Sequence, residues 1–218
     1  MTNTPTPLLR QWVRVGIGSG VLACVVYPLL VFIPMPRHLT VVLAAAFGPA
    51  LAVASMGLYQ FVKFHKDSVS AQIAVVSNIL AGALVTAMLI VQLALRMGME
   101  RHFNEQGTDE AVRKIVHWIW FVDLGLDVSF DVFIGLGTLL FALNMLKHPR
   151  FGLLVGWVGI FIAAVMVLGF NFYSFPDPPK EVGLLDPGPF TGLWYLWVVI
   201  LMACSWEWVE SPAAGGSE

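Results

Sequence analysis

Three aspartates at every fourth position are the residues of this chain whose spacing most plainly suggests chemistry. Asp123, Asp127 and Asp131 lie in the segment from Ile115 to Phe133. In a helix they would share one face, a turn apart. Carboxylates can bind cations, carry protons or form ion pairs. Because the surrounding segment is strongly apolar, their role depends on the environment in which the helix holds them.

The composition is that of a membrane protein. Of the 218 residues, 58% are apolar and 12% are charged, whereas a typical soluble domain has roughly 25% charged residues. Most Lys and Arg residues lie in short gaps between long uncharged stretches, as expected for membrane spans. The sequence therefore predicts an all-α, polytopic membrane protein. The net charge of −2 offers no basic surface for nucleic acid.

Hydropathy predicts a bundle of six transmembrane helices within residues 12–208. Each span is close to the ~20 residues needed to cross a ~30 Å hydrocarbon core. The expected spans are residues 12–33, 39–62, 70–95, 115–146, 151–172 and 190–206. Residues 1–11 would be a cytoplasmic N-terminal segment, and residues 209–218 a disordered tail.

Two connections are longer than tight turns. In residues 97–113, Thr108 is the expected N-cap of the following helix. Residues 173–189 contain five prolines, which disfavour a helix and predict a stiff, extended cover over the bundle. Those prolines are Pro176, Pro178, Pro179, Pro187 and Pro189.

Glycines at short intervals predict places where helices approach closely. They are Gly16, Gly18 and Gly20 in the first span and Gly152 and Gly156 in the fifth. The first group follows no strand, so it is not a phosphate-binding loop. We expect both groups to be packing seams.

The depth of the three aspartates can be estimated from the basic end of the fourth span, at Leu146. At 1.5 Å per residue, Asp131 lies roughly 23 Å from Leu146, Asp127 roughly 29 Å and Asp123 roughly 35 Å. Against a ~30 Å slab, Asp123 is expected to be a hydrated interfacial acid and Asp127 to lie at the boundary. Asp131 should lie about one turn inside and face the bundle interior. For Asp127 and Asp131, a fixed structural role and a ligand- or proton-binding role both remain open.

Polar and aromatic residues at the same end of other spans are the expected companions of these acids. Arg96 is the natural counter-ion for Asp131 or Asp127, since guanidinium binds carboxylate in two-point geometry. We expect a cavity that opens outward, with its floor near Asp131 and residues 175–189 as its cover. The candidate ligand-binding residues are Asp131, Asp127, Arg96, Gln92, Asn171, Tyr173 and Trp194.

Several kinds of chemistry lack their required residues. None of the predicted spans contains a lysine for a retinal-type Schiff base, and the histidines lie at span ends or in loops. The sequence contains no HExxH, GxSxG or Walker-type motif. We therefore assign no catalytic residue, no metal site and no cofactor.

The charges at the span ends favour both termini in the cytoplasm. The Lys and Arg residues divide equally between the two sides. However, Arg10 and Arg14 precede the first span, and the short connections near Lys66 and Lys147 are basic, which the positive-inside rule places in the cytoplasm.

Four segments resemble a family of bacterial multi-pass membrane proteins of unknown function. They are residues 127–135 (DVSFDVFIG), 148–152 (HPRFG), 171–176 (NFYSFP) and 188–194 (GPFTGLW). The resemblance extends over about residues 124–197. It implies a location in the bacterial cytoplasmic membrane and implies no activity.

Three functions are compatible with these observations. The first is binding of a small molecule, a cation or a proton in the outer half of the bundle, as in a sensor or transporter. The second is a non-catalytic structural or accessory membrane subunit, and the third an interfacial lipid-modifying enzyme. The expected partners are membrane lipids, a small-molecule or cation ligand, and a second copy or another membrane subunit.

Overall fold

The computed structural model describes residues 6–102 and 110–210, and within these residues every regular element is a helix. Six helical segments are long and apolar enough to cross a membrane, which confirms the predicted all-α, multi-pass fold. They are α1 (Pro7–Phe32), α2 (Arg37–His65), α3 (Val69–His102), α4 (Glu110–Met145), the continuous run of α5 (Gly152–Phe161), η1 (Ile162–Phe170) and α6 (Asn171–Ser174), and α7 (Pro187–Cys204). Two shorter helices are η2 (Pro179–Val182) and α8 (Trp206–Glu210).

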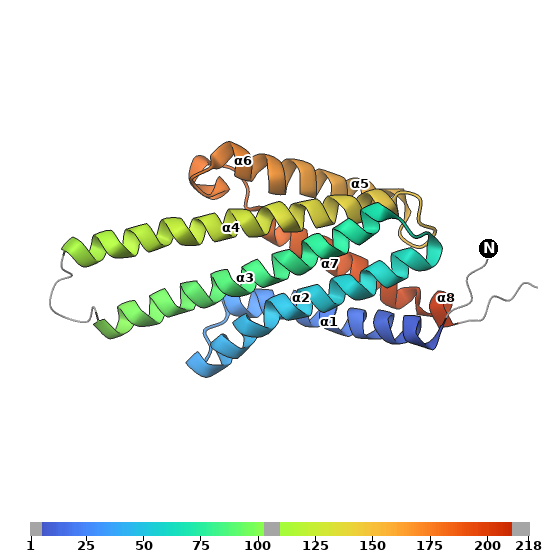
Figure 1. The fold of residues 1–218 in the computed structure, drawn as a ribbon, viewed down its shortest axis with the longest axis horizontal. Helices are drawn as coiled ribbons and strands as arrows, with labels where there is room; N and C mark the ends of the chain where they lie inside the picture. Colours follow the sequence, from blue (N-terminus) through green and yellow to red (C-terminus); the bar gives the residue numbers. More distant parts are fainter. Residues whose placement is uncertain (1–5, 103–109, 211–218) are drawn as a thin grey trace, which may run out of the picture.

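The spans form a closed ring. Each span packs against its neighbours in the sequence, and α7 completes the ring by packing against α1 on one side and α5 and η1 on the other. The start of α1 and the end of α8 lie at the same end of the bundle (Figure 1). We call this the inner end and the opposite one the outer end.

Large buried side chains fill the inner half of the ring. Phe61, Phe141, Met145 and Met202 are almost fully buried there and belong to one apolar cluster. Close packing of this kind supplies much of the association energy of helices in lipid. The free space in the bundle lies mainly outward of this cluster.

The helices α3 and α4 are longer than predicted and project beyond the rest of the bundle at its outer end (Figure 1). The 36 residues of α4 span about 54 Å at 1.5 Å per residue, against a ~30 Å hydrocarbon core. Hydropathy detects only the part of a helix that crosses lipid, so the predicted spans 70–95 and 115–146 were shorter than these helices.

Two of the helices that begin earlier than predicted start at a capping residue followed by proline. Thr6 accepts a hydrogen bond from the amide of Leu9 at 3.2 Å, and Pro7 opens α1. Asp186 caps α7 in the same way, and Pro187 is its first residue. Capping side chains and proline at the first helical position both favour helix starts, whereas hydropathy placed these starts at residues 12 and 190.

The proline-rich connection is not the extended cover that we expected. It contains the 3₁₀ helix η2, which begins at Pro179 and is followed by Gly183 in the left-handed conformation. Proline is tolerated at the first position of a helical turn, because the amide hydrogen that it lacks would be unpaired there. The connection is therefore a compact, partly helical cap.

The predicted glycine seams are only partly correct. Gly16 lies directly against Gly57, so α1 and α2 touch through their backbones, and a Cβ on either residue would collide with the other helix. Gly18, in contrast, has open space around its Cα. Gly152, the first residue of α5, has a φ of +80° and serves the start of the helix rather than a helix contact.

The fifth span changes its hydrogen bonding halfway. Residues 162–170 form the π-helix η1 between α5 and α6, in which each amide bonds five residues back instead of four. This segment carries the chain to Asn171, which is buried.

Three predictions concern the ends of the chain or the outer loop. The N-cap at Thr108 and the tail residues 211–218 lie outside the described residues, as do residues 1–5. Val209 and Glu210, which were predicted to be disordered, belong to α8. Val209 is fully buried, because α8 folds back against α1 and α7.

Candidate ligand-binding cavity

A cavity of about 370 Å³ lies inside the ring, lined by residues of α1, α2, α3, α4, α6 and α7 and of the segment that contains η2. Pockets for small molecules usually measure roughly 300–1,000 Å³, so this one suits a small ligand. Pro178, Pro179 and Lys180 line its outer end, as expected for a cavity covered by the proline-rich connection. Lys180 and Asp186 are also solvent-exposed, so the cavity reaches the outer surface there.

The polar groups of the cavity gather at its outer end. Asp127 and Asp131 line it from α4, one turn apart, and Asn171 lines it from α6. Asn171 is close enough to the Asp131 carboxyl to interact with it, while its amide nitrogen donates to the carbonyl of Val167 at 2.8 Å. Both aspartates keep part of their surface accessible because they face the cavity.

No cation neutralises these carboxylates within the described part of the chain. The ion pairs found there are Lys63–Asp67, Arg96–Glu100 and Lys114–Glu110. The expected pair between Arg96 and Asp131 or Asp127 is not among them. Arg96 instead lies on the projecting end of α3, where its Nε is 3.4 Å from Glu100 Oε1 and its side chain is 79% exposed.

Asp186 was missed as a site residue. Its Oδ1 accepts a hydrogen bond from the amide of Gly188 at 2.9 Å, which fixes the carboxyl at the start of α7, beside the cavity. The Asp-Pro pair at residues 186 and 187 carried a signal, since aspartate followed by proline is a strong helix start. Hydropathy alone ignores it.

Aromatic side chains line the same region. Tyr27 and Phe47 have ring centroids 5.9 Å apart and line the cavity from α1 and α2, while Phe130 lines it from α4. An added Cβ on Gly188 would lie 3.0 Å from the Tyr27 hydroxyl, so Tyr27 stands beside the start of α7. Faces of aromatic rings attract cations.

Asp123 is not the hydrated acid that we expected. It is 1% exposed, and its Oδ2 accepts a hydrogen bond from Gln92 Nε2 at 2.9 Å. The physical reason is the length of α3, which continues alongside the outer part of α4 and covers this face. Gln92 therefore joins α3 to α4 and does not line the cavity.

Two further predicted site residues lie elsewhere. Tyr173 is 79% exposed on α6 and lies away from the cavity. Trp194 is 2% exposed; its Nε1 donates to the carbonyl of Val155 at 2.9 Å, and its ring lies against Gly159. The structure thus brings together Asp131, Asp127 and Asn171 from the predicted set, but not Arg96, Gln92, Tyr173 or Trp194.

Deeper in the cavity the lining becomes apolar. It continues past Leu51 to Leu58 on α2 and past Val198 to Met202 on α7. Its two polar residues there, Ser55 and Tyr195, are already hydrogen-bonded.

A hydrogen-bonded network joins four helices beside this deeper part. Asn78 Nδ2 on α3 donates to Ser55 Oγ at 3.0 Å and to Tyr195 Oη at 2.8 Å. Thr138 Oγ1 on α4 lies 2.9 Å from Tyr195 Oη, and Ser55 Oγ donates to the carbonyl of Leu51 at 2.9 Å. The network ties α2, α3, α4 and α7 together, and its hydroxyls are occupied by protein partners.

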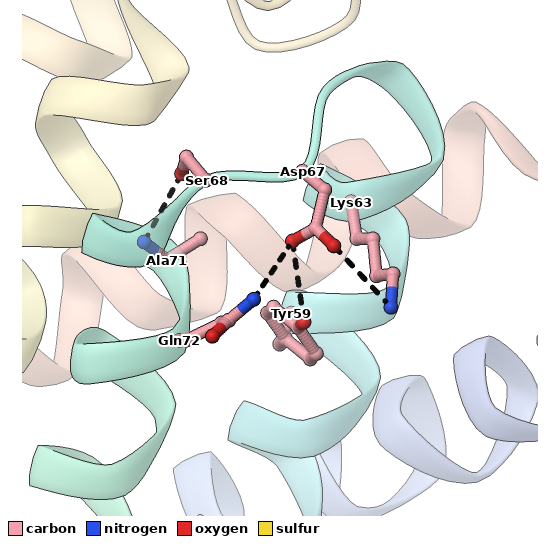
Figure 2. A network of polar contacts seen from close by, with 6 residues as sticks. All are labelled: Tyr59, Lys63, Asp67, Ser68, Ala71 and Gln72. Carbon is pink, nitrogen blue, oxygen red and sulfur yellow. Dashed lines mark hydrogen bonds and ion pairs between the residues drawn. The ribbon is translucent and has the colours of Figure 1, made fainter.

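An aspartate at the inner end of the bundle is also paired. Figure 2 shows Asp67, between α2 and α3, which accepts hydrogen bonds from Tyr59 and Gln72, each at 3.3 Å, and lies 3.5 Å from Lys63 Nζ. The pKa of the Asp67 carboxyl lies below its usual value. Slight burial would raise it, but the hydrogen bond from Gln72 and the charge of Lys63 outweigh that effect.

An aromatic box encloses His148 at the inner end. The imidazole is 2% exposed and has the rings of Phe61, Phe151 and Trp208 within 5.4 Å between centroids. Its Nδ1 accepts a hydrogen bond from the amide of Arg150 at 3.2 Å. Burial, followed by the proximity of His65, lowers the pKa of His148 to about 4, so the residue is neutral near pH 7.

The outer end of the cavity is chemically equipped to hold a positive charge, with carboxylates beside aromatic faces. Within residues 6–102 and 110–210, no three His, Cys, Asp or Glu side chains are placed to share a metal ion. An organic cation fits this lining, because its charge can lie near a carboxylate while its carbon atoms contact the rings. Protein-family models, curated proteins and solved structures were compared with the chain, and none of them matches it.

Proposed function

We propose that this protein binds a small organic cation in the outer half of its helix ring, as a sensor or a transporter-like protein does. The observation that carries the proposal is the cavity that reaches Asp131 while Arg96 is engaged with Glu100. A carboxylate buried in a membrane bundle needs a cation, a proton or water as a partner. Here a bound ligand can supply the positive charge that the protein does not place beside Asp131.

The lining favours an organic cation over an anion. Asp127, Asp131 and Asp186 face a single lysine, Lys180, around the cavity. Tyr27 and Phe47 add ring faces that attract alkylammonium groups. An anion would meet three carboxylates and is disfavoured.

The location follows as part of the same proposal. The protein acts in the bacterial cytoplasmic membrane with both termini in the cytoplasm, so the cavity opens toward the outer side. Its partners are the surrounding lipids and the cation. A second copy of the chain or another membrane subunit is a further partner in the accessory-subunit alternative.

A thermal-shift titration of the purified protein tests this function. The probes are tetramethylammonium, choline and ethylammonium, with glutamate and acetate as anionic controls. We expect the cations to raise the unfolding temperature, because a ligand at 100 times its Kd stabilises the folded state by about 2.7 kcal/mol. Asp131→Asn should abolish the shift, while Asp67→Asn, the same substitution outside the cavity, should leave it intact.

The opposite result favours the accessory-subunit function. If these cations shift neither wild type nor Asp67→Asn at millimolar concentration, the cavity is not a site for small cations. A partner captured by a tagged protein in lipid nanodiscs, with the projecting ends of α3 and α4 as the contact, would then be the expected finding.

A further inference from the structure

The shape and polarity of the cavity narrow the ligand further, and we infer that the cation is amphiphilic: an ammonium head beside Asp127 and Asp131, with an unbranched hydrocarbon tail directed inward along α7. This inference rests on the proposed function, since it names the class of cation that the same cavity takes. It rests on the length of the cavity, on the change in polarity along that length and on the hydrogen bonds of the deeper polar residues.

The cavity is long rather than round. Its lining on α7 runs from Pro187 to Met202, which is about 22 Å along the helix at 1.5 Å per residue. On α2 the lining runs in the same direction, from Phe47 to Leu58. A compact ligand would fill only part of this length.

The polarity changes along that length. The carboxylates and Asn171 lie at the outer end, while Leu51, Leu58, Val198 and Met202 line the inner part and are nearly fully buried. Apolar surroundings of this kind favour hydrocarbon and disfavour a second charge. A ligand with one polar end matches the gradient.

The two deeper polar residues that line the cavity, Ser55 and Tyr195, already have hydrogen-bond partners. The Tyr195 hydroxyl is engaged by Asn78 and Thr138, and the Ser55 hydroxyl by Asn78 and the carbonyl of Leu51. A polar group placed there would have to displace these partners. The inner part therefore selects hydrocarbon.

Binding of straight-chain primary ammonium ions, from ethylammonium to dodecylammonium, to the protein in lipid nanodiscs tests the inference. Free aqueous ligand is measured by equilibrium dialysis, and uptake by empty nanodiscs is subtracted. We expect the Kd against free aqueous ligand to tighten about fourfold per added methylene, the factor expected for burying one CH₂ group. The gain should stop once the tail fills the cavity.

A variant with a larger side chain in the inner part of the cavity tests where the hydrocarbon tail lies. Ala54, half-buried on α2, lines the cavity. In Ala54→Phe the larger side chain should shorten the space for the tail, so the affinity should stop rising at a shorter chain length than in wild type, while ethylammonium still binds. Ala54→Leu is the milder version if the larger side chain prevents folding. Ala45→Phe, the same substitution at an exposed position of α2, should behave like wild type.

The outcomes separate this inference from the function on which it rests. If ethylammonium binds in an Asp131-dependent manner but added methylenes bring no gain beyond that in empty nanodiscs, the amphiphile inference is overturned and the cation site stands. If no ammonium ion binds in that manner, both are overturned. Straight-chain alcohols of equal length are the control for the head. Equal affinity for alcohol and ammonium would also overturn the inference, because the carboxylates would then contribute nothing.

Discussion

Aspartates at the two ends of the helix ring differ in the partners that the protein gives them. At the inner end, Asp67 has three partners from α2 and α3, and His148 is enclosed by rings. At the outer end, Asp127 and Asp131 face a cavity, with no cation paired to them among the described residues. A paired carboxylate stabilises a fold, whereas a carboxylate without a paired cation is available to a positively charged ligand. The same residue type therefore has a structural role at one end and a proposed binding role at the other.

The largest expected effect concerns Trp194, which the sequence suggested as a ligand contact and the structure places in the core. Trp194→Ala should lower the free energy of unfolding by about 3–5 kcal/mol, because it leaves a large void and removes the hydrogen bond to the carbonyl of Val155. Chemical unfolding in detergent measures this. Trp194→Phe, which retains most of the ring volume, should lose clearly less. If Trp194→Ala were as stable as wild type, the assignment of Trp194 to the core would be wrong.

The next effect is a pH dependence that belongs to the inner end. The pKa of His148 is about 4 in the fold and ~6.5 in an unfolded chain. The unfolded chain therefore binds the additional proton between these values. The stability that a neutral His148 provides is complete above pH 6.5 and is lost as the pH falls toward 4, by about 3 kcal/mol.

Unfolding free energies at pH 7.5 and pH 4.5 measure this effect for wild type and for His148→Phe, which keeps an aromatic ring and removes the titration. We expect the variant to lose less stability on acidification than wild type does. Equal losses would mean that other groups control the response.

A smaller effect is expected from the network that crosses the ring. Tyr195→Phe removes the hydroxyl that meets Asn78 and Thr138. It should lower the free energy of unfolding by about 1 kcal/mol, near the value for one hydrogen bond, and interhelical bonds in membranes average slightly less. Thr86→Val is a matched control, because the Thr86 hydroxyl bonds only within its own helix. An equal loss in both variants would argue against a special role for the network.

The smallest effect compares one substitution at the two ends. Asp131→Asn removes a buried carboxyl group that lies one turn from the Asp127 carboxyl, so it should raise the free energy of unfolding by about 0.5 kcal/mol in the absence of ligand. Asp67→Asn removes a paired charge that is nearly half exposed and should lower it by about 0.5 kcal/mol. Opposite signs support the contrast between the ends, and a loss at Asp131 would show that its contact with Asn171 stabilises the fold.

The helices and the outer polar cluster could be predicted because their signals are local. Apolar runs mark the spans, and the four-residue spacing places Asp127 and Asp131 on one face. The positions of Arg96, Tyr173 and Trp194 could not be predicted. A span that is apolar on all sides does not reveal which face turns inward; that depends on the order of helices around the ring. The position of the Arg96 side chain also depends on how far α3 continues beyond the membrane.

The π-helix η1 sets the direction in which the end of the fifth span faces. Its wider turns rotate the chain by a smaller angle per residue than the roughly 100° of an α-helix. If residues 162–170 took up α-helical hydrogen bonding, the residues that follow would rotate about the helix axis, and Asn171 would leave the cavity wall. Substitutions in this stretch that favour α-helical over π-helical hydrogen bonding should therefore reshape the cavity without changing any residue that lines it.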